Sequence, residues 1–273
     1  MTALAFLLGL VVGSFLNVCI HRWPRGESVI APRSRCPACD RQIAWHDNIP
    51  TLSYIVLRGR CRSCGAAISP RYLVVELATA VLLALAVLEF GTGLVAFKVA
   101  LLAALLTILF FTDLEHFVLP DQVTLSGLLA GVALSPFVPL RAGIAQVGCD
   151  LLGLYPAPWA VSLIESLASA LVFGGGLYVM GEIFYRLRGV EGLGFGDVKL
   201  VAMLAAFQGS SEALLVLLAA CLLATLYGTA AVLSGRQQWR SPLPLGSYLA
   251  FAGIAASFCA DDILNRYWDL VLE

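Results

Sequence analysis

The chain has 273 residues and a formal net charge of -1, and 60% of its residues are apolar while 13% are charged. Its mean hydropathy of +0.88 lies far outside the range of soluble domains. These values exclude an ordinary soluble protein and indicate a chain embedded in a lipid bilayer, whereas the small net charge points to no particular partner.

Eight apolar stretches follow one another along the chain, and each predicts a membrane-embedded helix, because about 20 apolar residues cross roughly 30 Å of hydrocarbon. The sixth stretch is too short to cross alone, so we expect it to tilt, to continue through Gln208 and Gly209, or to form a hairpin with the next stretch. The first has no basic segment before it and no small-residue cleavage site after it, which predicts a retained helix. The stretches are residues 3–20, 73–90, 94–111, 123–138, 162–185, 198–207, 213–233 and 245–259.

The fold class that follows is an all-α polytopic membrane protein of about eight transmembrane helices. Three parts are predicted: a first transmembrane helix at 1–20, a small cytoplasmic loop domain at 21–72, and a multi-helix membrane domain at 73–273. Residues 140–158, with their proline and glycine, read as an outer connector without chemistry.

The positions of lysine and arginine predict the orientation, since short cytoplasmic loops carry an excess of positive charge. With residues 21–72 inside, fourteen of the seventeen basic residues fall on the cytoplasmic side, and Lys98, Arg141 and Arg266 stay near the other face. Both termini are then outside. The cytoplasmic set is Arg22, Arg25, Arg33, Arg35, Arg41, Arg58, Arg60, Arg62, Arg71, Arg186, Arg188, Lys199, Arg236 and Arg240.

The segment 21–72 carries two Cys-x-x-Cys pairs separated by twenty-one residues, namely Cys36, Cys39, Cys61 and Cys64. This spacing is typical of a tetrahedral zinc site with four thiolates, and Gly65 suits a tight turn after the second pair. The zinc is expected to be structural, because four thiolates leave no open coordination position and a loop of about 50 residues has a small core. Disulfides are the weaker alternative in a reducing compartment.

Two short polar segments place carboxylates at the ends of apolar stretches, where the membrane meets water. Asp113 follows the third stretch and Asp197 precedes the sixth, and the predicted topology puts both on the cytoplasmic side. A carboxylate at a membrane edge is costly and is therefore a functional-site hypothesis. Two such groups that meet can share one proton and activate water for peptide hydrolysis.

The neighbours of these aspartates have simpler interpretations. Gly194 and Gly196 allow a close approach of the backbone or a positive φ, although glycine-flanked aspartate is also ordinary turn chemistry. Asp121, after Pro120, is expected to cap the next helix, and Lys199 is expected to extend its ammonium group to the interface.

The ordered series of motifs resembles the type IV prepilin peptidases, the bifunctional leader peptidases and N-methyltransferases of bacterial type IV pilus and type II secretion systems. The similarity covers nearly the whole chain. It implies that Asp113 and Asp197 are the catalytic aspartates, and the Gly-x-Gly-Asp signature also resembles that of presenilin-type intramembrane aspartyl proteases. The resemblance is carried by the two cysteine pairs and by residues 13–22, 47–50, 57–61, 68–72, 113–121 and 194–199. Residues expected to support the catalytic segments are Gly194, Gly196, Lys199, Pro120 and Asp121.

The resemblance further implies an inner-membrane enzyme that cleaves prepilins or pseudopilins at the cytoplasmic membrane edge, after the glycine that ends a short basic leader. It also implies transfer of a methyl group from S-adenosylmethionine to the new N-terminus. No glycine-rich loop of a βαβ unit occurs in 21–72, so any cofactor pocket is expected around Trp45, Asn48 and the membrane edge. The expected partners are the substrate and the lipid bilayer, without nucleic acid.

Other classes of protein fit less well. A zinc metalloprotease lacks its ligands, because His21, His46 and His116 are the three histidines and no His-Glu-x-x-His motif is present. A membrane thiol oxidoreductase uses single exposed Cys-x-x-Cys pairs more often than two pairs at zinc spacing. A proton-coupled transporter stays an alternative, because such proteins also keep membrane carboxylates, although this chain shows no internal repeat.

Overall fold

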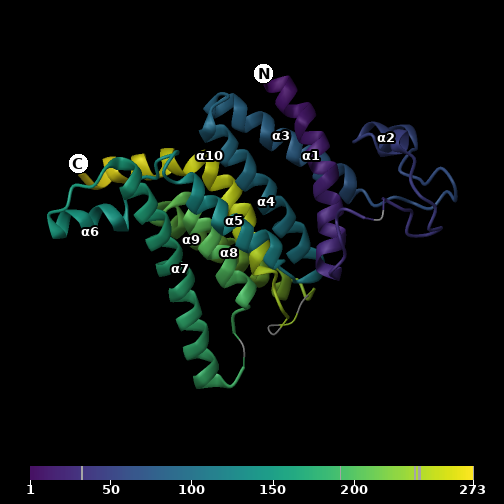
Figure 1. Cartoon of the computed structure of the whole chain (residues 1–273). Coiled ribbons are helices and arrows are strands. Elements are labelled where there is room, and N and C mark those ends of the chain that lie inside the picture. The colour runs from purple at the N-terminus through teal and green to yellow at the C-terminus, as the bar shows by residue number, and fades with distance from the viewer. Residues whose placement is uncertain (32, 191, 237, 239–240, 273) are drawn as a thin grey trace. The chain divides into compact units, whose positions relative to one another are not determined.

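The computed structural model describes residues 1–31, 33–190, 192–236, 238 and 241–272 (Figure 1). Its described residues form helices and connecting segments, with two isolated β-bridges in the cysteine-rich segment. Arg240, which was counted in the predicted cytoplasmic set, lies outside the described residues. The elements are α1 (Thr2–Arg22), η1 (Trp23–Arg25), η2 (Trp45–Asn48), α2 (Leu52–Val56), α3 (Arg71–Phe90), α4 (Leu94–His116), α5 (Asp121–Leu134), α6 (Ile144–Leu152), α7 (Pro158–Arg188), α8 (Phe195–Gln208), α9 (Ser210–Leu233) and α10 (Leu245–Leu272).

Each of the eight predicted apolar stretches coincides with a helix, although α5 ends at Leu134 and not at the predicted 138, and this confirms the all-α polytopic fold class. In the described part of the chain, six helices are long and apolar enough to cross a membrane, namely α1, α3, α4, α7, α9 and α10. The other two, α5 and α8, have 14 residues each, which corresponds to roughly 21 Å of helix. Gly209, whose φ is +81°, separates α8 from α9, and the two helices contact each other, so the expected continuation of one helix through Gln208 and Gly209 is wrong and the structure favours the hairpin.

The chain divides into two compact units, Met1–Ile108 and Leu109–Glu273, with the boundary inside α4. In the first unit α1 packs along α3, because glycines on α1 remove the side chains that would separate the two backbones. A Cβ on Gly9 would lie 2.5 Å from the Cα of Ala80, and one on Gly13 would lie 2.7 Å from the Cα of Glu76. Larger residues at either glycine would force the helices apart.

The cysteine-rich segment is joined to these two helices by side chains of α1 and α3. Asn17 donates from Nδ2 to the carbonyl of Tyr72 at 3.0 Å, and Glu76 accepts from the backbone N–H of Thr51 at 2.5 Å. Within the segment, Arg62 forms a bidentate ion pair with Asp47, with an N–O distance of 2.6 Å for the shortest contact. These contacts attach a segment with little apolar core to the membrane helices.

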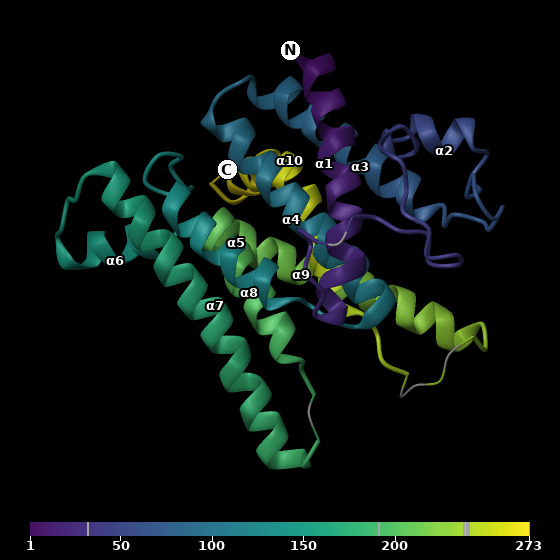
Figure 2. The same cartoon turned by 45° about the vertical axis from the view of Figure 1, so that its right-hand side comes forward.

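In the second unit α8 is the central helix, and nine of its fourteen residues are buried. It packs against α5, α7, α9 and α10, and Figure 2 shows α7 running alongside it. A Cβ on Gly131 of α5 would lie 2.8 Å from the ring of Phe207, and one on Gly174 of α7 would lie 2.7 Å from the Cβ of Ala202. The surrounding helices therefore hold α8, with Asp197 in its first turn, in a fixed place.

A buried carboxylate joins the starts of two helices to α7. Glu165 is 1% exposed, and its oxygens accept hydrogen bonds from the backbone N–H of Ala145 at 2.7 Å and from the N–H and hydroxyl of Ser210 at 3.0 and 2.6 Å. The hydroxyl of Ser169 donates a further bond at 3.0 Å. Helix N-termini stabilise negative charge, and these donors satisfy the buried group. Residues 140–158 are thus more than the connector predicted from sequence, because they contain α6.

Candidate functional site

Asp113 lies in the last full turn of α4 and is held by the start of α10. Its side chain is buried, and its Oδ2 accepts from the backbone N–H of Ser247 at 2.6 Å and from the Ser247 hydroxyl at 3.0 Å. The same hydroxyl lies 3.1 Å from the carbonyl oxygen of Phe110. Both bonds to the carboxylate use one oxygen, so Oδ1 is left to interact with another group.

Leu119 links the ends of three helices around this carboxylate. After α4 the chain bends at Phe117, which has a φ of +53°, and this bend directs the following residues across the ends of α8 and α10. A Cβ on Gly196 of α8 would lie 3.1 Å from the Cβ of Leu119, and one on Gly246 of α10 would lie 3.0 Å from both Leu119 and the Cγ of Asp113. Glycine is favoured at these two positions, because a Cβ at either one would make the side chain of Leu119 or Asp113 shift by a few tenths of an ångström.

Asp197 belongs to this cluster through the first turn of α8. The helix is too short to be one of the six candidate spans, and the carboxyl is half-buried. Burial, followed by the negative charge of Asp113, raises the pKa of Asp197 from its ordinary value of 3.8 to about 6. The two aspartates are thus close enough for the charge of one to affect the titration of the other.

The capping role predicted for Asp121 is wrong. Pro120 is the N-cap residue of α5, and Asp121, as the first residue of the helix, makes no capping hydrogen bond. Its carboxylate instead forms an ion pair with the ammonium group of Lys199, whose side chain is 17% exposed. This pair connects the start of α5 to α8, two residues after Asp197.

The four predicted metal-ligating cysteines converge in the first unit. All four Sγ atoms lie within 4.8 Å of one another, and those of Cys36 and Cys64 are 3.8 Å apart. A tetrahedral zinc ion with bonds of ~2.3 Å places its sulfurs roughly 3.8 Å from each other. The donor set and its geometry therefore fit a metal ion of this kind.

The two cysteine pairs sit in matching turns. One turn is closed by the bridge between Arg35 and Gln42, and the other by the bridge between Arg60 and Ala67. The residue after the second cysteine of each pair has a positive φ, +71° at Gly65 as expected from sequence and +53° at Asp40. Aspartate tolerates this conformation better than most residues do, which explains how the first turn forms without glycine.

Sequence reasoning missed three residues of the aspartate cluster: Leu119, Gly246 and Ser247. Leu119 and Ser247 are common residues in an apolar chain. Pro242 and Pro244 before α10, with Gly246 in its first turn, were the one local signal that a specific helix start lies there.

Fold and site together define a class: a polytopic helical membrane protein with two carboxylates brought together at helix ends and a separate four-cysteine metal-type cluster. Residues 7–90 match the bacterial peptidase A24 N-terminal domain, and residues 100–229 match the type IV leader peptidase family. The chain belongs to this family.

Among its relatives are proteins named prepilin leader peptidase/N-methyltransferase. The protein from Aeromonas salmonicida is 35% identical over 295 residues, covering 99% of this chain and 94% of the relative. The one from Pseudomonas aeruginosa is 33% identical, covering 96% and 91%, and the one from Myxococcus xanthus is 43% identical, covering 74% and 54%. No solved structure matches the chain significantly.

Proposed function

We propose that this protein is a membrane aspartyl endopeptidase that removes the short basic leader of prepilins or pseudopilins after glycine. The observation that carries the proposal is the cluster in which Ser247 of α10 fixes Asp113, while Leu119 packs against Gly196, the residue next to Asp197. Family membership and the names of the relatives support the substrate class.

The proposed reaction is acid–base hydrolysis at this aspartate pair. One aspartate is ionised and takes a proton from water as the water attacks the scissile carbonyl, and the protonated partner donates a hydrogen bond to the carbonyl oxygen. The pair keeps one proton between its members, so it titrates as a unit. Ser247 keeps Oδ2 of Asp113 occupied, which leaves Oδ1 for the water or for the shared proton.

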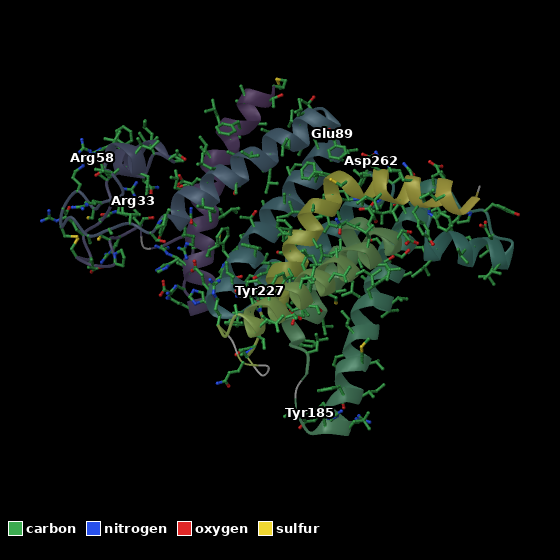
Figure 3. The ribbon with its side chains drawn as sticks, turned by 180° about the vertical axis from the view of Figure 1, so that it is seen from behind. Arg33, Arg58, Glu89, Tyr185, Tyr227 and Asp262 are labelled. Carbon is green, nitrogen blue, oxygen red and sulfur yellow. The ribbon has the colours of Figure 1, made fainter. Side chains whose placement is uncertain are left out.

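The protein is a multi-pass inner-membrane protein, and we propose that the aspartate pair faces the cytoplasm. The arginine-rich segment between α1 and α3 supports this orientation, and Arg33 and Arg58 are exposed on it (Figure 3). At that membrane edge a substrate can keep its apolar helix in lipid while its basic leader lies in water. The division of the chain at residues 20 and 72 into membrane and loop parts belongs to the same proposal.

The four-cysteine cluster is proposed to hold structural zinc through Cys36, Cys39, Cys61 and Cys64. Zinc would stabilise the fold of a segment that buries little apolar surface, and four thiolates would leave no position for water or substrate. The metal therefore takes no part in the proposed hydrolysis.

We also propose N-methylation of the new N-terminus with S-adenosylmethionine as donor, the activity named for the relatives. The loop offers one aromatic side chain suited to stacking on the adenine, because Trp45 on η2 is 78% exposed. S-adenosylmethionine would supply the methyl group, and the loop would bind and orient it.

The test of this function is incubation of the purified protein with a pilin-like peptide, a basic leader with a Gly-Phe junction and an apolar helix, in lipid nanodiscs. Mass spectrometry should find a product cut after glycine, and addition of S-adenosylmethionine should add one CH₂ unit to its new N-terminus. Failure of the folded protein to cut would refute the peptidase, and a cut product that stays unmethylated would refute only the transferase.

A further inference from the structure

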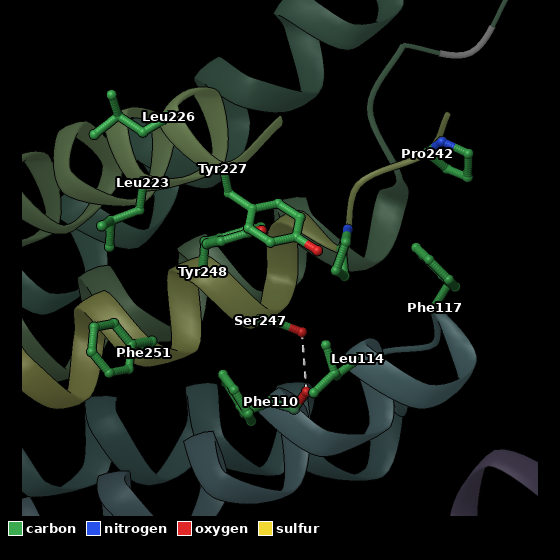
Figure 4. A pocket seen from close by; sticks show the side chains of 11 residues that line it. Phe110, Leu114, Phe117, Leu223, Leu226, Tyr227, Pro242, Ser247, Tyr248 and Phe251 are labelled. Atoms are coloured by element: carbon green, nitrogen blue, oxygen red, sulfur yellow. Dashed lines mark hydrogen bonds between the residues drawn. The ribbon is translucent and has the colours of Figure 1, made fainter. Parts of the chain in front are cut away.

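A cavity of about 660 Å³ lies beside Asp113, between the end of α4, α9 and the start of α10 (Figure 4). Its walls are mostly aromatic rings and leucines, and among the described residues eleven line it, none of them charged. Phe110 contributes from α4, Tyr227 from α9, and Tyr248 and Phe251 from α10. This volume falls within the ~300–1,000 Å³ typical of pockets that bind ligands.

The cavity is continuous with the aspartate cluster through one residue. Ser247 lines the cavity and also donates to Asp113 at 3.0 Å (Figure 4 draws its second contact, to Phe110). Leu114, the residue after Asp113, and Phe117 at the bend after α4 line the same cavity. An occupant would therefore lie next to the reacting carboxylate.

We propose that this cavity binds the first turn of the substrate's apolar helix, immediately after the scissile bond. The inference rests on the proposed function, in which a basic leader and an apolar helix flank the cut. The described wall favours the apolar half, because it contains no carboxylate to pair with lysine or arginine and removes apolar side chains from water. Binding of the helix start here would present the preceding peptide bond to Asp113 and Asp197.

A lipid acyl chain is the competing occupant, because it has the same apolar chemistry and the cavity lies in a membrane protein. The two occupants differ in their consequence for catalysis. If the cavity binds substrate, changing its shape alters the kcat/KM of cleavage. If it binds lipid, changing its shape leaves the substrate's affinity unaltered.

The test fills the cavity from the α9 side, away from the aspartates. Leu223 and Leu226 line it, so L223W/L226W should lower kcat/KM for the pilin-like peptide by roughly tenfold or more, mainly through KM. The matched control is L218W/L222W, two exposed leucines of the same helix that do not line the cavity, and it should behave as wild type. Thermal unfolding and size-exclusion chromatography verify that both variants are folded.

A second readout identifies the occupant directly. A photoreactive phenylalanine analogue in the first turn of the peptide is irradiated with the uncleaving Asp197→Asn variant in nanodiscs, and the cross-linked residues are mapped. Cross-links to residues 223–227 or 244–251 are expected. Cross-links from a photoreactive phospholipid there, with none from the peptide, would overturn the proposal.

The outcomes distinguish a failure of the proposed subsite from a failure of the proposed peptidase function. Cleavage by wild type with equal kcat/KM in both double variants would overturn the subsite and leave the peptidase intact. Absence of cleavage by folded wild type would overturn the proposed function and the subsite together.

Discussion

Replacement of Ser247 by alanine removes the hydroxyl that donates to Asp113 and leaves the backbone N–H in place. A hydrogen bond to a charged group contributes ~1.5–3 kcal/mol. Because the N–H bond at 2.6 Å persists, we expect the lower end of this range, which corresponds to a roughly tenfold loss in kcat/KM.

The assay is steady-state cleavage of the pilin-like peptide by purified variants in nanodiscs. Ser247→Thr is the matched control, because threonine keeps a hydroxyl at the same position, and it should recover most of the lost activity. If Ser247 had only a structural role, Ser247→Ala would lower the unfolding temperature, and Ser247→Thr would not restore the activity.

Two results would refute this reasoning. One is wild-type kcat/KM in folded Ser247→Ala, which would show that the bond to Asp113 does not position the carboxylate. The other is equal activity of the alanine and threonine variants below wild type, which would show that the hydroxyl is not the group that matters.

Three further predictions concern the metal, the stability and the packing of the site. Cys36→Ser should lower bound zinc and protein yield, because three thiolates and a hydroxyl hold the ion poorly; full zinc by elemental analysis in a stable variant would show that Cys36 is not a ligand. Asp197→Asn should stabilise the fold at pH 7 by roughly 1–3 kcal/mol, because a carboxyl whose folded pKa of about 6 exceeds its unfolded value near 3.8 costs stability as pH rises between them. Unfolding in detergent should show this gain vanish below about pH 4, and a gain independent of pH would contradict the assignment. Gly196→Ala should slow cleavage because its Cβ would lie 3.1 Å from Leu119, and Leu119→Ala in the same chain should restore part of the rate; a double variant no faster than Gly196→Ala would place the defect elsewhere.

Features that depend on a short stretch of sequence, such as the helices, were predicted from that stretch alone. Apolar runs located the eight helices α1, α3, α4, α5, α7, α8, α9 and α10, because burial in lipid needs an unbroken apolar segment. The helix ends were less predictable: α10 continues to Leu272, well beyond the predicted 259, because Asp261 and Asp262 lower the hydropathy without ending the helix. The nine-residue helix α6 has no apolar run long enough to be predicted as a helix.

The metal cluster was also predictable, because the ligand spacing within each pair and between the pairs is a local property of the chain. The same holds for the positive φ of Gly65. At Asp40, which adopts this conformation in the first turn, residue type alone gave no comparable signal.

Contacts between distant segments were beyond sequence reasoning. Ser247 and Asp113 are separated by 134 residues, and Lys199 and Asp121 by 78. Each residue has a common local interpretation, as a helix start, a cap or an interfacial lysine, and the packing around α8 decides otherwise. The pairing of Asp113 with Asp197 was predicted from the position of both at membrane edges, and its catalytic role stays a prediction.

The central claim is that Asp113 and Asp197 act as one catalytic pair. The most direct test compares cleavage of the pilin-like peptide by wild type, Asp113→Asn and Asp197→Asn, with folding verified for each, because asparagine keeps the shape of the side chain and removes the acid. We predict cleavage after glycine by wild type and none by either variant. Cleavage that survives in either folded variant would contradict the claim.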